Sequence, residues 1–174
     1  MNLSDPFKIL SPNERWAPTQ GQMDAFQNAY EKLLPPLVYK IRIAVAKWRD
    51  EGYQGASETS KSLLNFWFNQ EHLIGQTKFS FFFSQREAIE SIIYLYEIAK
   101  ARDKYELVRF DSSQRVSTGM FEETWTRYVI KMATGAGKTK VMGLTLVWSY
   151  FHKLYEAGST LSKDFLVIAP NIIV

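Results

Sequence analysis

A glycine-rich segment, residues 132–139 (Met-Ala-Thr-Gly-Ala-Gly-Lys-Thr), constrains the fold of this chain more than any other feature. It follows a short β-type run, residues 127–131, and precedes a long helix-prone stretch. Glycine at positions 135 and 137 allows the backbone to curl, so that its N–H groups point inward around an anion. The N-terminus of the following helix adds unpaired N–H groups and partial positive charge. A strand, a glycine loop and a helix in this order predict a phosphate-binding loop.

The residue types after the glycines fit the chemistry of a bound nucleoside triphosphate. The Lys138 ammonium would contact the β- and γ-phosphates as the catalytic group, and the Thr139 hydroxyl would be a ligand of Mg²⁺. The predicted nucleotide-binding residues of this loop are Thr134, Gly135, Ala136, Gly137, Lys138 and Thr139. Met132 departs from the common pattern, which has glycine there. The alternative interpretation is a glycine-rich turn that only caps a helix.

Composition excludes several other kinds of site. The chain has no cysteine and two histidines, which excludes disulfides, a cysteine nucleophile and a multi-histidine metal site. The formal net charge of +3 is too small to indicate nucleic-acid binding. Residues 1–10 have no apolar core of a secretory signal, and the apolar run 141–151 is far shorter than the roughly twenty residues of a membrane span. We therefore expect a cytoplasmic protein with no membrane partner.

The first part of the chain predicts helices. Apolar spacing of three and four residues indicates helices over residues 24–34, 37–50 and 57–69. The second of these has a basic polar face, formed by Lys40, Arg42, Lys47 and Arg49. This face could contact DNA phosphates, or it could be an ordinary solvated helix surface whose side chains extend into water.

The stretch before the glycine loop follows a run of phenylalanines, residues 79–83. Ser84 and Glu87 have the spacing of a capping box, which predicts a helix that starts at Ser84 and continues to about Arg102. In residues 104–111, apolar side chains (Tyr105, Leu107, Val108 and Phe110) have a spacing that predicts a strand.

After the glycine loop, residues 140–155 predict a helix that is buried on most sides, and residues 164–169 predict a continuous apolar strand. With residues 127–131, they would form a right-handed βαβ unit of an α/β fold. Glu156 and Asp164 are the only acids after Lys138, and neither follows an apolar strand. A hydrolase of this type also needs an acidic residue at another strand end, and more strands to cover the sheet. We therefore expect a front piece of a longer protein, or a subunit completed by another chain.

Three features together carry a resemblance to a known family: Gln85, the core at residues 134–139, and the segment 165–171 (Phe-Leu-Val-Ile-Ala-Pro-Asn). They are similar to the first landmarks of superfamily-two helicases. The chain most resembles the helicase-like restriction subunit of type III restriction systems and related DEAD/DEAH-box proteins. The blocks 6–16 and 58–64 also resemble that group, so the likeness spans nearly the whole chain.

This resemblance implies that Gln85 bonds the edge of adenine, which makes ATP with Mg²⁺ the expected cofactor. It implies a mainly helical region, residues 1–78, followed by the start of a RecA-like parallel sheet, residues 79–174. By resemblance, the intact protein would couple ATP hydrolysis to movement along DNA during restriction. The expected partners are DNA and either the remainder of the motor or a modification subunit. The acidic motif and the second motor domain of the family are missing here, so we expect no turnover by this chain alone.

Two other interpretations remain open. A small stand-alone phosphotransferase with a phosphate loop would show turnover by itself. A truncated, non-enzymatic interaction module, or a decoy for a larger complex, would bind its partner without any dependence on nucleotide.

Overall fold

The computed structural model describes residues 5–12, 37–111, 116–120 and 127–168. In chain order, its helices and strands are α2 (Val38–Asp50), α3 (Glu58–Asn69), β1 (His72–Ile74), β2 (Thr77–Phe79), α4 (Phe83–Ile93), the π-helix η1 (Tyr94–Ile98), α5 (Lys104–Val108), the 3-10 helix η2 (Thr118–Met120) and α6 (Lys138–Tyr155). The helix predicted over residues 24–34 lies outside the described residues.

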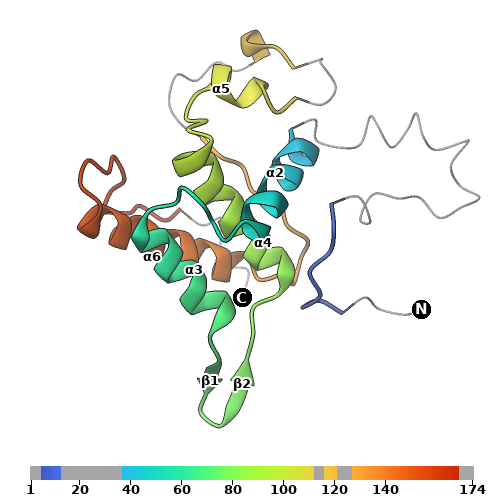
Figure 1. Ribbon diagram of the computed structural model, residues 1–174, viewed down its shortest axis with the longest axis vertical. Coiled ribbons are helices and arrows are strands. Elements are labelled where there is room, and N and C mark those ends of the chain that lie inside the picture. The colour runs from blue at the N-terminus through green and yellow to red at the C-terminus, as the bar shows by residue number, and fades with distance from the viewer. Residues whose placement is uncertain (1–4, 13–36, 112–115, 121–126, 169–174) are drawn as a thin grey trace, which may run out of the picture.

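The helices α2, α3 and α6 pack around α4, which η1 continues without a break (Figure 1). α2 lies on one side of α4, while α6 and α3 pack against α4 and against each other. One hydrophobic core joins these helices, with Trp48, Leu64, Ile89 and Trp148 among its buried residues. Residues on both sides of the predicted boundary at 78/79 contribute to this core, and the division into two domains stays a prediction.

Three helices predicted from apolar spacing are confirmed. α2 ends before Gly52, whose φ of 69° is in the left-handed region that favours glycine after a helix. Ser57 caps α3, since its side chain accepts a hydrogen bond from the Ser60 N–H. α6 begins two residues earlier than the predicted helix, immediately after Gly137.

Two strands of three residues form the only sheet in the described part of the chain, an antiparallel hairpin that projects from the helices (Figure 1). His72 pairs with Phe79 and Ile74 pairs with Thr77 across the hairpin. The sequence did not predict it, because three residues are too few for an alternating apolar pattern to stand out.

The predicted strand over residues 104–111 is wrong, because α5 occupies its first half. The Asp103 carboxylate accepts a hydrogen bond from the Glu106 N–H at 2.9 Å and so caps the helix. An ion pair of 2.8 Å between Arg109 and Glu106 adds a second local contact. These local contacts override the weak alternation of apolar residues.

The predicted cap of α4 at Ser84 is also wrong. The helix begins at Phe83, and its N-cap is Phe82, two residues before Ser84. The Phe83 N–H donates to the Pro6 carbonyl at 2.9 Å, and the Phe82 N–H donates to the Gln85 side-chain oxygen at 3.1 Å. Pro6 and Gln85 therefore satisfy two backbone donors at the start of α4.

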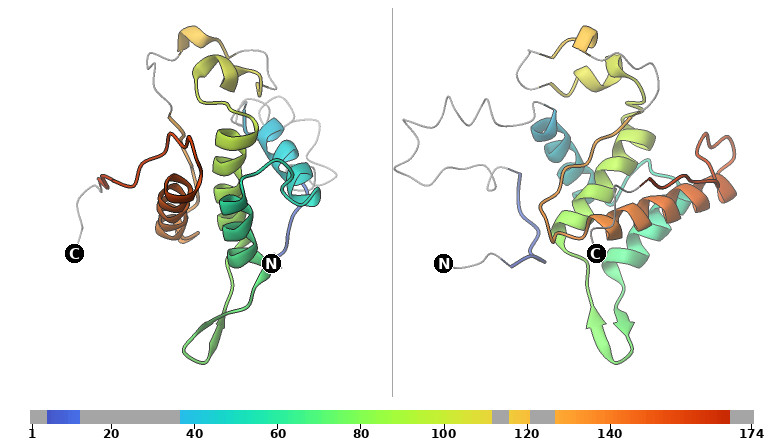
Figure 2. Two further views of the ribbon diagram at one scale, coloured as in Figure 1. Left: turned by 60° about the vertical axis from the view of Figure 1, so that its left-hand side comes forward. Right: turned by 180° about the vertical axis from the view of Figure 1, so that it is seen from behind.

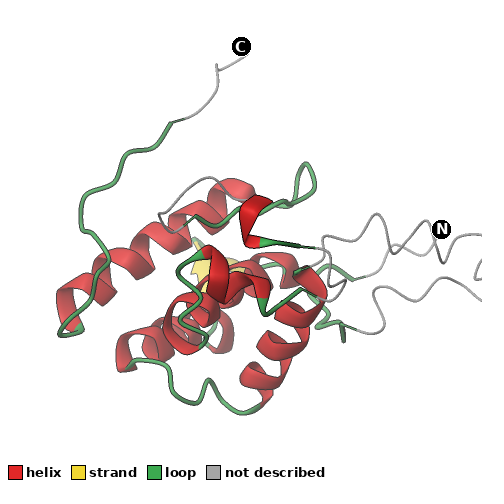
Figure 3. Cartoon of the chain, turned by 90° about the horizontal axis from the view of Figure 1, so that it is seen from above, coloured by secondary structure: helices red, strands yellow, loops and turns green. Residues whose placement is uncertain are grey.

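Residues 127–131 and 164–168, predicted as parallel strands, form no strand in the structure. After α6 the chain turns and runs away from the helices (Figures 2 and 3). The fold described here thus contains helices and a small antiparallel hairpin, whereas the predicted parallel sheet is not seen. None of the described helices combines the length and the apolar character required to cross a membrane.

Candidate functional site

The glycine loop connects the extended residues 127–133 to α6 through a turn at residues 134–136. Gly135 and Gly137 have φ values of 79° and 80°, which only glycine adopts without strain. Gly137 is the N-cap of α6 and stands in the left-handed conformation. The turn predicted at these two glycines is present, and it places the loop at the N-terminus of an 18-residue helix.

The Lys138 and Thr139 side chains lie on the first turn of α6, and both residues are exposed. The Lys138 ammonium donates to the Ala133 carbonyl at 3.0 Å, so the lysine folds back over its own loop. Both residues line a cavity of about 520 Å³ between α6, α4 and residues 128–132. A cationic and a hydroxyl group therefore open onto the same space.

The rest of this cavity is mostly apolar, and Tyr128 forms part of its wall. The Tyr128 hydroxyl donates to the Ala101 carbonyl at 3.0 Å. Burial raises the pKa of Tyr128 to about 12, so the phenol stays neutral near neutral pH. Met132, which departs from the usual loop pattern, also lines this cavity.

Gln85 is the one predicted site residue that comes from outside the loop, and the structure brings it against the loop. Its carboxamide nitrogen donates to the Ala136 carbonyl at 3.0 Å, while its oxygen accepts from the Phe82 N–H. The residue is only 6% exposed. Gln85 therefore links the start of α4 to the loop, a contact that the sequence did not reveal.

This contact is a second reason, besides the positive φ, why position 137 requires glycine. A Cβ at Gly137 would overlap the Gln85 side-chain nitrogen and would lie 3.3 Å from its Cδ. A larger residue at position 137 would therefore have to displace the Gln85 carboxamide from the loop.

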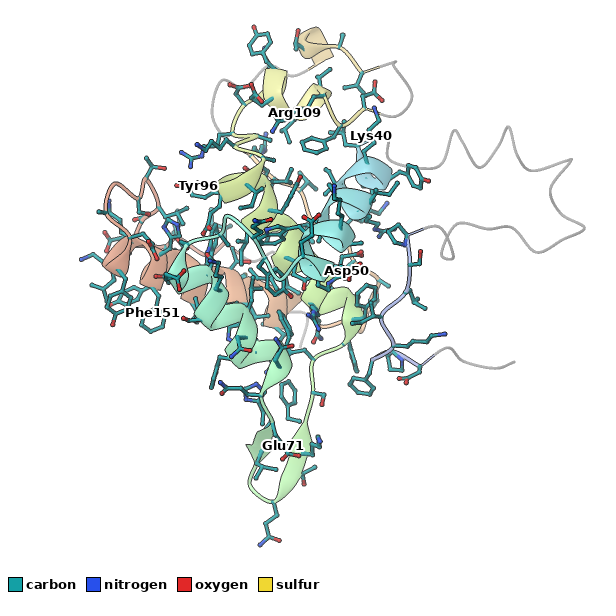
Figure 4. The ribbon with its side chains drawn as sticks, in the orientation of Figure 1. Lys40, Asp50, Glu71, Tyr96, Arg109 and Phe151 are labelled. Atoms are coloured by element: carbon teal, nitrogen blue, oxygen red, sulfur yellow. The ribbon has the colours of Figure 1, made fainter. Side chains whose placement is uncertain are left out.

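The basic side chains of α2 were candidates for phosphate contacts. Each of them instead has an acceptor within the protein, and Lys40 reaches the Asp111 carbonyl at 2.6 Å, at the end of α2 nearest α5 (Figure 4). The side chains concerned and their acceptors are Lys40 with Asp111, Arg42 with Glu87, Lys47 with Glu51, and Arg49 with Glu90. These contacts favour a structural role for the basic face.

Among the residues that the structure describes, no three histidine, aspartate or glutamate side chains gather as potential ligands of a metal ion. The Thr139 hydroxyl remains the predicted protein ligand of Mg²⁺, and its exposure beside the Lys138 ammonium fits a metal bound together with phosphate oxygens.

Comparison with known protein families identifies a match to the second half of the chain. The family model described as type III restriction enzyme, res subunit, matches residues 78–174, which is more than half of the chain and includes Gln85, the loop and α6. No curated protein and no solved structure matches the chain.

Proposed function

Because the chain belongs to the res-subunit family of type III restriction enzymes, we propose that it is the nucleotide-binding portion of an ATP-dependent, helicase-like motor that acts on DNA. The observation that carries this proposal is the loop at residues 134–137. It turns at two glycines with positive φ and leads directly into the N-terminus of α6. A turn of this kind before a long helix presents backbone N–H groups to an anion.

In this proposal, the N–H groups of residues 134–139 bind the phosphates, and Lys138 leaves the Ala133 carbonyl to contact them. The Thr139 hydroxyl would hold Mg²⁺, which when bound neutralises phosphate charge. We propose that Gln85 reads the nucleotide through the donor and acceptor capacity of its amide that the Ala136 and Phe82 contacts leave unused.

Two segments support a larger sheet in the working motor. Residues 127–131 and 164–168 contain large apolar side chains, yet Val129, Leu166 and Ile168 are 87%, 85% and 83% exposed. The outer side of α6 also exposes apolar residues, including Met142, Tyr150 and Leu154. We propose that both segments become strands of a RecA-like parallel sheet whose other strands cover α6. Hydrolysis and movement along DNA would then need that complete sheet and the acidic residue it contributes.

Thermal unfolding in the presence of Mg²⁺ and ATP tests the proposal. ATP should raise the melting temperature of the chain, and Lys138→Ala should remove that increase because the phosphates lose their cationic partner. Lys140→Ala is the matched control, since Lys140 lies half a turn further along α6 with its ammonium over the Phe79 ring. An ATP-dependent increase that persists in Lys138→Ala would refute the role of the loop.

A direct assay separates this proposal from a stand-alone phosphotransferase. The chain alone should show no ATP turnover above background, with or without DNA. Turnover that disappears in Lys138→Ala would show that the chain is a complete enzyme. Partner binding that is unaffected by both ATP and Lys138→Ala would favour the non-enzymatic interaction module.

A further inference from the structure

A second group of polar side chains lies at the opposite end of α6 from the glycine loop. It joins Glu97 of η1, His152 in the last turn of α6 and Ser159 in the segment that follows α6. Their sequence neighbours Tyr96 and Phe151 are labelled in Figure 4. Nothing in the nucleotide-binding proposal uses this cluster.

The Glu97 carboxylate is buried and accepts several hydrogen bonds. It accepts from the Ser57 N–H at 2.8 Å, from the Ser57 hydroxyl at 3.1 Å and from the Ser60 hydroxyl. The His152 Nε2 atom lies 3.1 Å from the same carboxylate, and the two side chains are 9% and 8% exposed. The carboxylate is the acceptor in each of these contacts, and it can accept a hydrogen bond from the imidazole Nε2–H in the same way.

This contact determines which imidazole nitrogen faces Ser159. Because Nε2 must carry a proton to bond Glu97, the neutral ring leaves a lone pair on Nδ1. Nδ1 lies 2.7 Å from the Ser159 hydroxyl oxygen. In the neutral ring with the proton on Nε2, the Ser159 hydroxyl donates to Nδ1, which is the arrangement in which a histidine can act as a general base toward a serine.

Ser159 is accessible and has a positive charge close by. The residue is partly exposed, and its hydroxyl oxygen also accepts from the Leu161 N–H at 3.3 Å. The Lys153 ammonium donates to the Ser159 carbonyl at 2.7 Å. A cation beside the serine can stabilise the negative charge that develops when the hydroxyl attacks a carbonyl.

We propose that Ser159 is an activated nucleophile that accepts acyl groups from small activated esters, with His152 as its general base and Glu97 as the positioning residue. The Ser159 oxygen forms a bond to the ester carbonyl carbon, and its proton passes to His152 Nδ1. The bond between that carbon and the leaving oxygen then breaks. The leaving group departs as an alcohol after it takes the proton from His152, or as a stable anion while the proton goes to water.

The test uses p-nitrophenyl acetate and the whole chain, with release of p-nitrophenolate and peptide mass spectrometry as readouts. Ser159 should acquire an acetyl group at least ten times faster than in the same chain denatured in urea. Ser159→Ala should remove this fast phase. The matched control is Ser162→Ala, because the Ser162 hydroxyl accepts from the Asp164 N–H at 3.0 Å, two residues further on, as the Ser159 hydroxyl accepts from the Leu161 N–H. That variant should react as the unaltered chain does.

The histidine is tested by His152→Gln, whose amide can still bond both Glu97 and Ser159. Loss of the general base should slow acetylation of Ser159 by about 10² or more. Glu97→Gln should slow it less, because it removes charge but keeps an acceptor. The proposal is overturned if acetylation occurs on lysines or on Ser162 instead, or if folded His152→Gln, checked by circular dichroism, reacts at the original rate.

Discussion

Similar apolar residues are buried in the helical body, formed by α2, α3, α4 and α6, but exposed in the two extended segments, residues 127–131 and 164–168. Val45, Leu64, Ile89 and Ile93 in the helices are fully buried, whereas Val129, Leu166 and Ile168 in the extended segments are almost fully exposed. A helix satisfies its backbone hydrogen bonds within itself, so α2, α3, α4 and α6 need only one another to bury their side chains. A strand must find another strand for the same purpose. The comparison shows that the helices bury their apolar side chains against one another, whereas the extended segments do not.

The largest expected effect concerns the buried ion cluster inside the helical body. Glu90 is 0% exposed and binds Arg49, Arg86 and the Tyr53 hydroxyl. Burial, with the Glu90 charge, raises the pKa of Tyr53 well above its ordinary value, so Tyr53 remains a donor. Glu90→Ala removes the carboxylate partner of two guanidinium groups, those of Arg49 and Arg86, whose side chains are 7% and 16% exposed, and it should lower the free energy of unfolding by about 3–5 kcal/mol.

Chemical denaturation measures this change. Glu58→Ala is the control, because the Glu58 side chain is 87% exposed and pairs with Lys61 at the surface, so its loss should cost less than about 1 kcal/mol. Equal effects of the two variants would mean that the cluster does not hold the body together.

Alanine variants of two leucines, one buried and one exposed, test the difference between the helical body and the extended segments directly. Leu64→Ala removes a fully buried side chain and should lower the free energy of unfolding by about 2–5 kcal/mol. Leu166→Ala removes one that is 85% exposed and should change it by less than about 0.5 kcal/mol. Both are measured by urea denaturation of the chain alone. A large loss in Leu166→Ala would show that residues 164–168 are already packed within this chain.

Glycine at the junction of the two regions gives a smaller effect. Gly137→Ala combines a positive φ with a steric conflict at Gln85, and it should cost about 1–3 kcal/mol and weaken stabilisation by ATP. Gly143→Ala is the control, because Gly143 lies inside α6 with nothing within 4 Å of the added Cβ. That variant should stabilise the chain by about 0.5–1 kcal/mol. Gln85→Ala combined with Gly137→Ala should recover the part of the loss that is due to the steric conflict.

The smallest effect depends on pH, at the edge of the helical body. Hydrogen bonds from the Thr59 side chain and from the Thr59 N–H, the latter at 2.9 Å, hold the pKa of the Glu156 carboxyl below its ordinary value of 4.5. The group therefore stabilises the fold above pH 4.5, and this contribution is lost as the pH falls through the lowered pKa. The melting temperature of Glu156→Gln should be lower than that of the unaltered chain at pH 7 and should approach it near pH 3. A constant difference across this range would contradict the assignment.

Local patterns in the sequence were sufficient for the helices and for the turn of the loop. The apolar spacing in α2, α3 and α6 gave their positions to within a few residues, because a helix depends on contacts three and four residues apart. Gly135 and Gly137 indicated the turn because few other residues tolerate their φ values. The res-subunit family was also recognisable, since its motifs are contiguous stretches of sequence.

Contacts between distant residues could not be predicted in this way. Ser84 had the pattern of a cap, but Pro6 and Gln85 satisfy the start of α4, and Pro6 is far away in the sequence. The bond from Gln85 to the Ala136 carbonyl spans 51 positions, and that between the Glu90 and Arg49 side chains spans 41. Such pairs leave no periodic signal in a single sequence.

The sequence by itself determined α2, α3 and α6, the glycine turn and the family, because each depends on residues that are neighbours along the chain. Only the tertiary structure decided that Gln85 lies against the loop, that Glu90 gathers two arginines, and that Glu97, His152 and Ser159 meet. Residues 127–131 and 164–168 illustrate the difference between what the sequence determines and what the tertiary structure decides. Their sequence favours a strand, but a strand forms only where the fold supplies a neighbouring strand to receive its hydrogen bonds.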